Sequence, residues 1–282
     1  MSGRVLRIAV VTAALVMPAT GPARPAGGGI DTVRIVPHSA IYSMSLSRID
    51  LDSSVFDFSG GLKINLIEDC EAWHLSQETV IGFVNTLGQG TPTILSHTAR
   101  ESKDGSWLRF AAERTWGRDR EAVTESHGGR VERRNGQLVA TYDGHDTPVV
   151  LSEQTLFPVA HSRKLLEAAQ RATRVFAARE FSGSERMESD VLVTAVIGNG
   201  TTGSNTPEGL DATVAEVLFS GTSWPVHLGY FSPDSRVDAP DYEVSMLLHE
   251  SGAVSSLTLH YDALDIDLGL EEVSLNALPD CP

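Results

Sequence analysis

Two cysteines are the side chains best suited to redox or metal chemistry in this sequence. Cys70 lies in the stretch IEDCEAW, and Cys281 is followed by a single proline. Two thiols allow one intrachain disulfide, whereas free thiolates bind metals or act as nucleophiles. Neither a C-x-x-C motif nor a metal-ligand spacing surrounds them. The choice between a disulfide and two free thiols in a redox or metal site therefore depends on the compartment of the protein.

A glycine pattern in VLVTAVIGNGTTG has the order of a dinucleotide-binding turn. Gly198, Gly200 and Gly203 follow an apolar strand with the G-x-G-x-x-G spacing. Such a turn binds pyrophosphate through the amides of a helix N-terminus that follows directly. Here Pro207 and Gly209 stand where that helix would run. The pattern therefore predicts a flexible loop between strands, and no nucleotide or other cofactor is expected.

Histidine and acidic residues near the C-terminus are candidate metal ligands. The nine histidines include no i, i+4 pair and no H-E-x-x-H motif, and His260 and Asp262 form at best a weak metal site on one face of a strand. Asp262, Asp265 and Asp267 are similar to a calcium loop, but Gly269 comes too early and the closing glutamate is misplaced. Alternating apolar residues in the same stretch favour a strand with an acidic outer face.

The sequence contains no recognisable nucleophile motif. No G-x-S-x-G elbow occurs, and the stretches GTSWP and SGSE fall short of it. Acidic residues are too numerous for a glycosidase pair to be chosen without geometry. We therefore predict no catalytic, cofactor-binding or metal-binding residues and a protein that is not an enzyme. An enzyme whose site the sequence does not reveal is the remaining alternative.

The charge and hydropathy of the chain exclude several classes of partner. The formal net charge is −15 at pH 7, so nucleic acid and anionic membrane surfaces are repelled. Hydrophobic residues make up 41% of the chain, which is enough for a packed core. Beyond the N-terminus no apolar run reaches transmembrane length, so no stable membrane insertion is expected.

The N-terminus has the pattern of an export signal. Arg4 and Arg7 precede an apolar run from Ile8 to Met17, which is too short to span a bilayer. Small residues then allow cleavage after Ala23, with Ala26 as the alternative site. An uncleaved anchor is the other interpretation. We predict a cleaved signal over residues 1–23 and therefore a periplasmic protein.

Export to an oxidising compartment decides between the two interpretations of the cysteines. A disulfide persists there, so Cys70 and Cys281 are expected to pair. The chain-entropy model gives such a long loop a stabilisation of about 5 kcal/mol as an upper value. We further predict a flexible segment over 24–32 and one domain over 33–282, because no internal repeat or composition break divides the rest.

Most of the domain has the patterns of antiparallel strands. Residues 42–47 and 62–66 alternate strictly between apolar and polar side chains. Asp104-Gly105, Asn135-Gly136 and Asp143-Gly144 provide hairpin turns at short intervals. After residue 174 the pattern returns to strands, in the order RVFAAREF, ESDVLVTAVI, DATVAEVLFS, WPVHLGYF, DYEVSMLLHE, AVSSLTLHYD and LDIDLGLEEVSL. A long antiparallel meander is the expected architecture.

One stretch, FPVAHSRKLLEAAQRAT, has helical periodicity. Pro158 suits a first-turn position, and apolar or small residues including Leu165, Leu166 and Ala169 recur at spacings of three and four. The opposite face is charged. We predict one amphipathic helix packed on a large sheet.

Several stretches, taken in order, resemble the cell-envelope integrity protein EipB family of exported Gram-negative proteins. They are PHSAIYSMSLSR, ESKDGSWLRF, TLFPVAHSRKLLEAA running on to FSGSE, WPVHLGYF, DYEVSMLLHESGAVSSLTLHYD and the final cysteine. The resemblance implies a mainly β fold in which about fourteen antiparallel strands coil into an open β-spiral or half-barrel with one packed helix. It also implies one disulfide, carried onto Cys70 and Cys281.

The same resemblance implies a function. It predicts a non-enzymatic periplasmic protein that maintains cell-envelope integrity by binding another envelope protein, with a helical-repeat protein as a candidate partner. The alternative is a carrier or sensor of lipid or lipoprotein, because a curved sheet leaves a concave apolar face that fits an acyl chain.

Overall fold

The computed structural model describes residues 33–50, 55–85, 90–117, 122–187, 189–203, 205–233 and 239–281. The predicted export signal over 1–23 and the predicted flexible segment over 24–32 lie outside the described residues.

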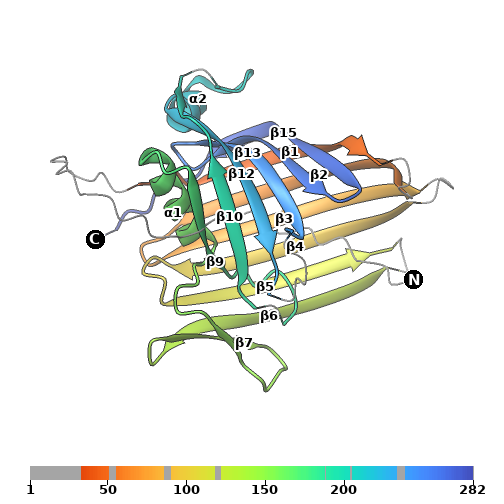
Figure 1. The fold of residues 1–282 in the computed structure, drawn as a ribbon, viewed down its shortest axis with the longest axis vertical. Helices are drawn as coiled ribbons and strands as arrows, with labels where there is room; N and C mark the ends of the chain where they lie inside the picture. The colour runs from red at the N-terminus through yellow and green to blue at the C-terminus, as the bar shows by residue number, and fades with distance from the viewer. Residues whose placement is uncertain are drawn as a thin grey trace.

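The described chain forms fifteen strands and two helices (Figure 1). In chain order they are β1 (His38–Ile49), β2 (Val55–Glu68), β3 (Ala72–Asn85), β4 (Gly90–Ser102), β5 (Trp107–Trp116), β6 (Val123–Arg134), β7 (Gln137–Tyr142), β8 (Val149–Leu151), α1 (Pro158–Gln170), β9 (Val175–Glu180), β10 (Val191–Ile197), β11 (Thr201–Thr202), α2 (Ala212–Phe219), β12 (Thr222–Phe231), β13 (Tyr242–His249), β14 (Val254–Tyr261) and β15 (Leu264–Leu275).

All strands belong to one antiparallel sheet with the order β8-β7-β6-β5-β4-β3-β2-β1-β15-β14-β13-β12-β10-β9, and β11 pairs with β12. The last strand, β15, pairs with the first, β1, so the two halves of the chain meet in the middle of the sheet. The edge strands β8 and β9 form no ladder with each other in the described part, so the sheet stays open. The predicted open β-spiral is confirmed, with fifteen strands where about fourteen were expected.

The sheet curls over itself and encloses the main core. In Figure 1, β9, β10, β12 and β13 cross in front of the strands that run from β2 to β6. Phe58 of β2 and Ile81 of β3 share one buried cluster with Val193 of β10 and Leu228 of β12, so these layers pack together. A second buried cluster, around Phe110, joins β4 to β8. The curved sheet therefore has two separate apolar cores, the main cluster between its layers and the second cluster against β4 to β8.

Helix α1 packs against the inner face of the sheet, as predicted. Leu165 and Leu166 are buried in the main cluster, and Pro158 is the first helical residue. The N-cap residue, Phe157, offers no side-chain acceptor. Instead, the Glu101 carboxylate of β4 accepts hydrogen bonds from the backbone N–H groups of Val159 (2.8 Å) and Ala160 (2.7 Å). A strand side chain therefore caps this helix.

Burial of Glu101 makes the stability of the folded chain depend on pH. Desolvation raises its pKa from 4.5 to about 7, although the two backbone donors and Arg163 act in the opposite direction. Because the pKa is higher in the folded chain, its stabilising contribution is complete below pH 4.5 and is lost as the pH rises through 7. The free energy of unfolding of the wild type, relative to Glu101→Gln, should therefore fall by about 3 kcal/mol between pH 4.5 and 8.

Urea denaturation at a series of pH values measures this difference. Glu113→Gln, which changes an exposed glutamate of β5, is the control and should give a curve parallel to that of the wild type. Parallel curves for Glu101→Gln as well would contradict the expected proton uptake.

The segment DATVAEVLFS was predicted as a strand, and this prediction was wrong. Its β-branched residues favour a strand, but the structure forms helix α2 there. The Asp211 side chain accepts hydrogen bonds from the backbone N–H groups of Thr213 and Val214, which caps the helix. Leu218 and Phe219 are buried beside Ala253. Capping and tertiary packing therefore outweigh local propensity.

The hairpin predictions are confirmed. Asn135 and Gly136, with φ angles of 52° and 88°, join β6 to β7, as a type I′ turn requires. Gly105 and Gly144 also have positive φ angles, 69° and 74°, in turns after β4 and β7. These positions favour glycine because a Cβ atom is strained there.

Candidate functional site

A cavity of about 300 Å³ lies on the inner face of the curved sheet. Most of the large apolar side chains of its lining come from β1, β2, β4, α1 and β13 to β15. These side chains are Tyr42, Met44, Leu62, Ile64, Leu95, Leu165, Met246, Leu248, Leu257, Leu259 and Leu268.

Strand alternation places these side chains in the cavity. Tyr42 and Met44 point inward from β1, and Ser43 and Ser45 point outward from the same strand. Leu62 and Ile64 also point inward, from β2. The two alternating stretches of the sequence therefore supply part of the apolar lining, and the packed sheet and helix supply the rest.

The cavity lining also includes polar side chains from β3, β5 and β6. They include Gln77, Thr79, Arg114, Glu125 and His127. Arg114 of β5 lies opposite Glu125 of β6 in the sheet register, and its guanidinium lies 5.3 Å from the centre of the Trp116 ring. The Nε atom of Arg114 is buried and has no hydrogen-bond partner among the described residues. The cavity therefore has an apolar region and a region with a partly buried cation.

The FSGSE segment, residues 181–185, crosses the inner face beside this polar region. Ring nitrogens of His97 and His127 lie 3.1 Å from the carbonyl oxygens of Ser182 and Gly183, respectively. Burial lowers the pKa of His97 to about 4, so its ring is neutral at pH 7 and donates through Nε2–H. Gly183 has a φ of 74°, and a Cβ atom there would lie 2.2 Å from the Phe110 ring. Glycine therefore allows the segment to lie flat on β5.

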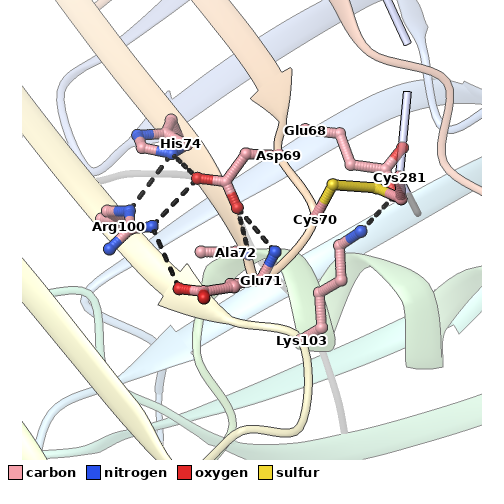
Figure 2. The surroundings of a disulfide bond; sticks show 9 residues. All are labelled: Glu68, Asp69, Cys70, Glu71, Ala72, His74, Arg100, Lys103 and Cys281. Atoms are coloured by element: carbon pink, nitrogen blue, oxygen red, sulfur yellow. Dashed lines mark hydrogen bonds and ion pairs between the residues drawn. A yellow bond between two sulfur atoms is a disulfide. The ribbon is translucent and has the colours of Figure 1, made fainter. Parts of the chain in front are cut away.

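A disulfide joins Cys70, in the turn between β2 and β3, to Cys281, with a Cα–Cα distance of 5.7 Å (Figure 2). The bond attaches the chain after β15 to the rim of the sheet. Nearby, the Asn276 side chain donates to the carbonyl oxygen of Leu66 over 2.7 Å. Both cysteines are used, so the described residues contain no free thiol.

Asp69 organises the turn beside the disulfide, as Figure 2 shows. Its Oδ1 atom accepts hydrogen bonds from the backbone N–H groups of Glu71 and Ala72. Its Oδ2 atom lies 2.6 Å from His74 Nε2 and 3.0 Å from the Arg100 guanidinium. These donors, His74 first, hold the pKa of Asp69 well below its usual range. The turn that carries Cys70 is therefore held in place by a carboxylate with four donors.

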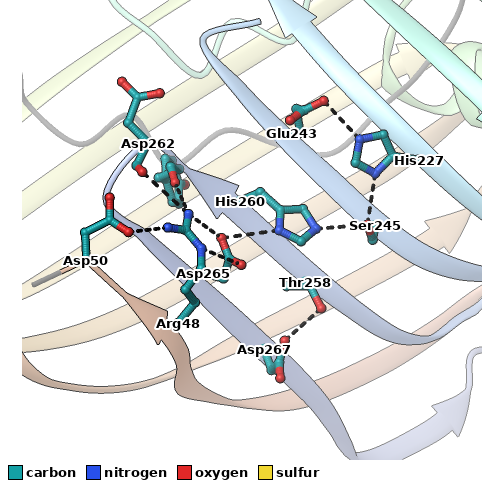
Figure 3. Close-up of polar contacts among 11 residues, drawn as sticks. Arg48, Asp50, His227, Glu243, Ser245, Thr258, His260, Asp262, Asp265 and Asp267 are labelled. Atoms are coloured by element: carbon teal, nitrogen blue, oxygen red, sulfur yellow. Dashed lines mark hydrogen bonds and ion pairs between the residues drawn. The ribbon is translucent and has the colours of Figure 1, made fainter.

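The predicted metal-binding candidates lie on the outer face, in a polar network (Figure 3). Asp265 of β15 accepts two hydrogen bonds, each 3.0 Å long, from the Arg48 guanidinium, which lowers its pKa. Asp267 accepts a hydrogen bond from Thr258. Asp262 belongs to the turn before β15 and lies at the edge of the network. The strand with an acidic outer face is confirmed, and the described residues contain no cluster of three metal-ligating side chains.

His260 and two residues that the sequence analysis did not single out form the centre of this network. The Ser245 hydroxyl lies 3.0 Å from His227 Nδ1 and 2.9 Å from His260 Nε2. The outer ring nitrogens of these histidines lie 3.0 Å from Glu243 and 3.3 Å from Asp265. The network therefore runs from Glu243 to Asp265 across β12 to β15.

A serine between two histidines has the residue types of a hydrolytic triad, but the surroundings of Ser245 differ from those of a catalytic serine. Ser245 lies within β13 and pairs with His227 of β12 and Thr258 of β14. The ladder on both sides uses the backbone N–H groups near its hydroxyl, so no pair of free N–H donors can stabilise an oxyanion. The register of three strands, which the sequence does not give, brings these side chains together.

The G-x-G-x-x-G pattern serves packing. A Cβ atom at Gly198 would lie 2.5 Å from Pro225, and one at Gly200 would lie 2.6 Å from the Trp224 ring. Gly203 has a φ of 69° in a turn, and α2 begins only at Ala212. The segment predicted as a flexible loop between strands contains the short strand β11 and leads into α2 instead of into a strand.

Comparison with known proteins identifies the family of this fold. A family model described as EipB-like matches residues 30–277. The chain belongs to the EipB-like family. A curated relative is the cell envelope integrity protein EipB of Brucella abortus (strain 2308), which is 26% identical over 239 residues, or 84% of this chain and 82% of that protein. The resemblance predicted from the motifs is therefore confirmed.

A solved structure supports the EipB-like fold. The crystal structure of a beta-barrel-like protein of a domain of unknown function from Brucella abortus matches with a TM-score of 0.78 at 22% identity. The match covers 87% of this chain and 100% of the other. No helix in the described part of the chain is long and apolar enough to cross a membrane.

Proposed function

We propose that this EipB-like protein is exported to the periplasm and maintains the cell envelope by binding an acyl chain of a lipid or lipoprotein in its inner cavity, without catalysis. The cavity is the observation that carries this proposal. Family membership, the disulfide and the name of the Brucella relative support an exported envelope protein. The Ser245 network, which lacks an oxyanion site among the described residues, gives no support for catalysis.

The lining of the cavity matches an amphiphile. A volume of about 300 Å³ is at the lower end of the range for ligand sites. Leucine, isoleucine and methionine side chains provide contacts for a hydrocarbon chain, and such a lining binds apolar groups more readily than water. The polar region near Arg114 provides a partner for an anionic or hydrogen-bonding headgroup. One acyl chain therefore fits this cavity better than a protein segment does.

Binding of a dansyl-labelled undecanoic acid to delipidated protein tests the proposal. Wild-type protein should take up one probe per chain with a saturable rise in fluorescence. Leu62→Trp fills the cavity and should weaken binding at least tenfold, because the added ring occupies the volume of the hydrocarbon chain. Val80→Trp, which enlarges an exposed side chain of β3, is the matched control and should bind as the wild type does.

The result that contradicts the proposal is equally specific. Probe uptake that does not saturate, or that is equal in wild type and Leu62→Trp, places the probe outside the cavity. Mass spectrometry of the protein purified from its own periplasm then provides an independent check, because a cavity ligand should be recovered in stoichiometric amounts.

The second candidate function is a scaffold that binds another envelope protein. The observation that favours it is a line of basic side chains across β3 to β6, which consists of His74, Arg100, Arg109 and Arg130. Crosslinking of a tagged copy in the periplasm, followed by protein mass spectrometry, tests whether a stoichiometric protein partner exists.

A further inference from the structure

Four basic side chains form a line across four neighbouring strands. In the sheet register His74 of β3 lies opposite Arg100 of β4, Arg100 lies opposite Arg109 of β5, and Arg109 lies opposite Arg130 of β6. Residues that lie directly opposite each other share a face of the sheet. We call these four residues the arginine row.

The arginine row lies on the outer face. Leu108 and Phe110, which flank Arg109 in β5, are buried in the second core cluster, so Arg109 points the other way and is exposed. The side chains of His74 and Arg130 are 42% and 55% exposed. A partner can therefore reach the whole row.

Without a bound partner, a row of like charges destabilises the folded chain. Like charges that lie directly opposite each other in a sheet repel. Acidic neighbours relieve this repulsion in part, because Arg100 pairs with Asp69 at 3.0 Å and Arg130 pairs with Glu132 at 3.3 Å. Arg109 lies between Arg100 and Arg130 and over the Trp107 ring, 5.9 Å from its centre. Glu132 acts on it at longer range, but the described residues provide no direct ion pair for it. Its guanidinium therefore remains available to an anion.

A depression with a mixed polar and apolar lining adjoins the row. Arg100 and Arg109 border it, and amide and hydroxyl side chains contribute to its lining. The lining includes Asn65, His74, Ser76, Thr98, Arg100 and Arg109. These groups can bind the remaining oxygen lone pairs of a carboxylate that a guanidinium holds.

We propose that the arginine row binds an acidic helical segment of a partner protein. Guanidinium groups bind carboxylates in a bidentate geometry, so three arginines in a line favour an acidic partner. Neighbouring strands lie about 4.8 Å apart, so the side chains of the row repeat at nearly the 5.4 Å pitch of a helix. Glutamates at i, i+4 and i+7 present carboxylates at this spacing, whereas alternate residues of an extended chain are about 6.7 Å apart.

A membrane surface fits the row less well. The row is one residue wide, and Asp69, Glu71 and Glu132 border it. A bilayer with anionic headgroups would therefore face these acids and the overall negative charge of the chain as well. A narrow line of carboxylates on one helix face avoids these contacts. The proposal concerns the outer face and does not depend on the cavity.

Fluorescence anisotropy with a designed helical peptide tests the proposal. The probe is an alanine-based peptide with glutamates at i, i+4, i+7 and i+11, and its control has glutamines at the same positions. At 30 mM salt the mature protein should bind the glutamate peptide, and binding should weaken as salt is added because exposed charges are screened. Arg109→Gln should lower the affinity at least tenfold. Arg171→Gln, which removes the same charge at the exposed end of α1, should leave it within twofold.

Thermal unfolding separates a binding surface from a structural role. Arg109→Gln removes like-charge repulsion, so its Tm should equal or exceed that of the wild type. Arg130→Gln provides a second variant with the same expected loss of binding. Unchanged peptide affinity in both row variants overturns the proposal, as does an equal loss in Arg171→Gln. Binding to vesicles of phosphatidylglycerol and phosphatidylcholine that depends on Arg109, without binding to the peptide, would identify a lipid surface instead and also overturn it.

Discussion

Leu166→Asp is expected to abolish the folded state. Leu166 is completely buried on α1, among apolar side chains from β1, β10 and β12 to β15. The substitution removes an apolar side chain and places a carboxylate where no cation is expected to reach it. Loss of the leucine alone costs about 2 to 5 kcal/mol, and an unpaired buried charge costs more. The sum approaches the whole stability of a typical domain, which is about 5 to 15 kcal/mol.

Far-UV circular dichroism and urea denaturation measure this effect. Gln170→Asp introduces the same charge at an exposed position of the same helix and should cost less than about 1 kcal/mol. A cooperative unfolding transition for Leu166→Asp near that of the wild type would show that this face of α1 is not a core surface.

Loss of the disulfide is expected to have the next largest effect on stability. Cys70 and Cys281 are 211 positions apart, and the chain-entropy model gives the bond about 5 kcal/mol of stabilisation as an upper value. The double variant Cys70→Ser, Cys281→Ser should therefore unfold at a much lower urea concentration than the oxidised wild type. Limited digestion with proteinase K should also release the C-terminal residues after β15 earlier, because the bond attaches them to the rim of the sheet.

Reduction provides the matched control for this experiment. Dithiothreitol should lower the stability of the wild type to that of the double serine variant and should not affect the variant itself. Equal unfolding midpoints for oxidised and reduced wild type would show that contacts such as the Asn276 hydrogen bonds hold the C-terminus without the bond.

The cavity and the arginine row place two binding surfaces on opposite faces of one sheet. The inner face is curved and apolar, and the outer face is open and charged. Period-two alternation makes this arrangement possible, because successive residues of one strand serve different faces. In β5, Phe110 packs in the second core, Arg109 belongs to the row, and Arg114 borders the cavity. Variants of single residues can therefore test each surface separately.

Local patterns of the sequence predicted much of the fold. Alternation in residues 42–47 and 62–66 indicated the strands that line the cavity, and Asn135-Gly136 indicated a tight turn. The periodicity after Pro158 indicated α1. These predictions were confirmed because strand alternation, turn angles and helix periodicity depend on neighbours within a few residues.

The segment over residues 211–220 shows where local reasoning fails. Val214 and Val217 favour a strand, yet the Asp211 cap and the burial of Leu218 and Phe219 beside Ala253 produce a helix. Leu218 and Phe219 pack against Ala253, which lies more than thirty positions further along the chain. Helix and strand propensities take no account of such distant contacts.

The sequence by itself determined the class of this protein: its motif order placed it in the EipB-like family, and its alternation and turns required an antiparallel sheet with an inward helix. Tertiary structure alone decided the cavity, the cap of α1 by Glu101, the Ser245 network and the arginine row. Each of these depends on the register between strands, and a shift of one residue would move every side chain of a strand to the other face. Register is set by the packing of the whole sheet, so single strands of the sequence do not reveal it.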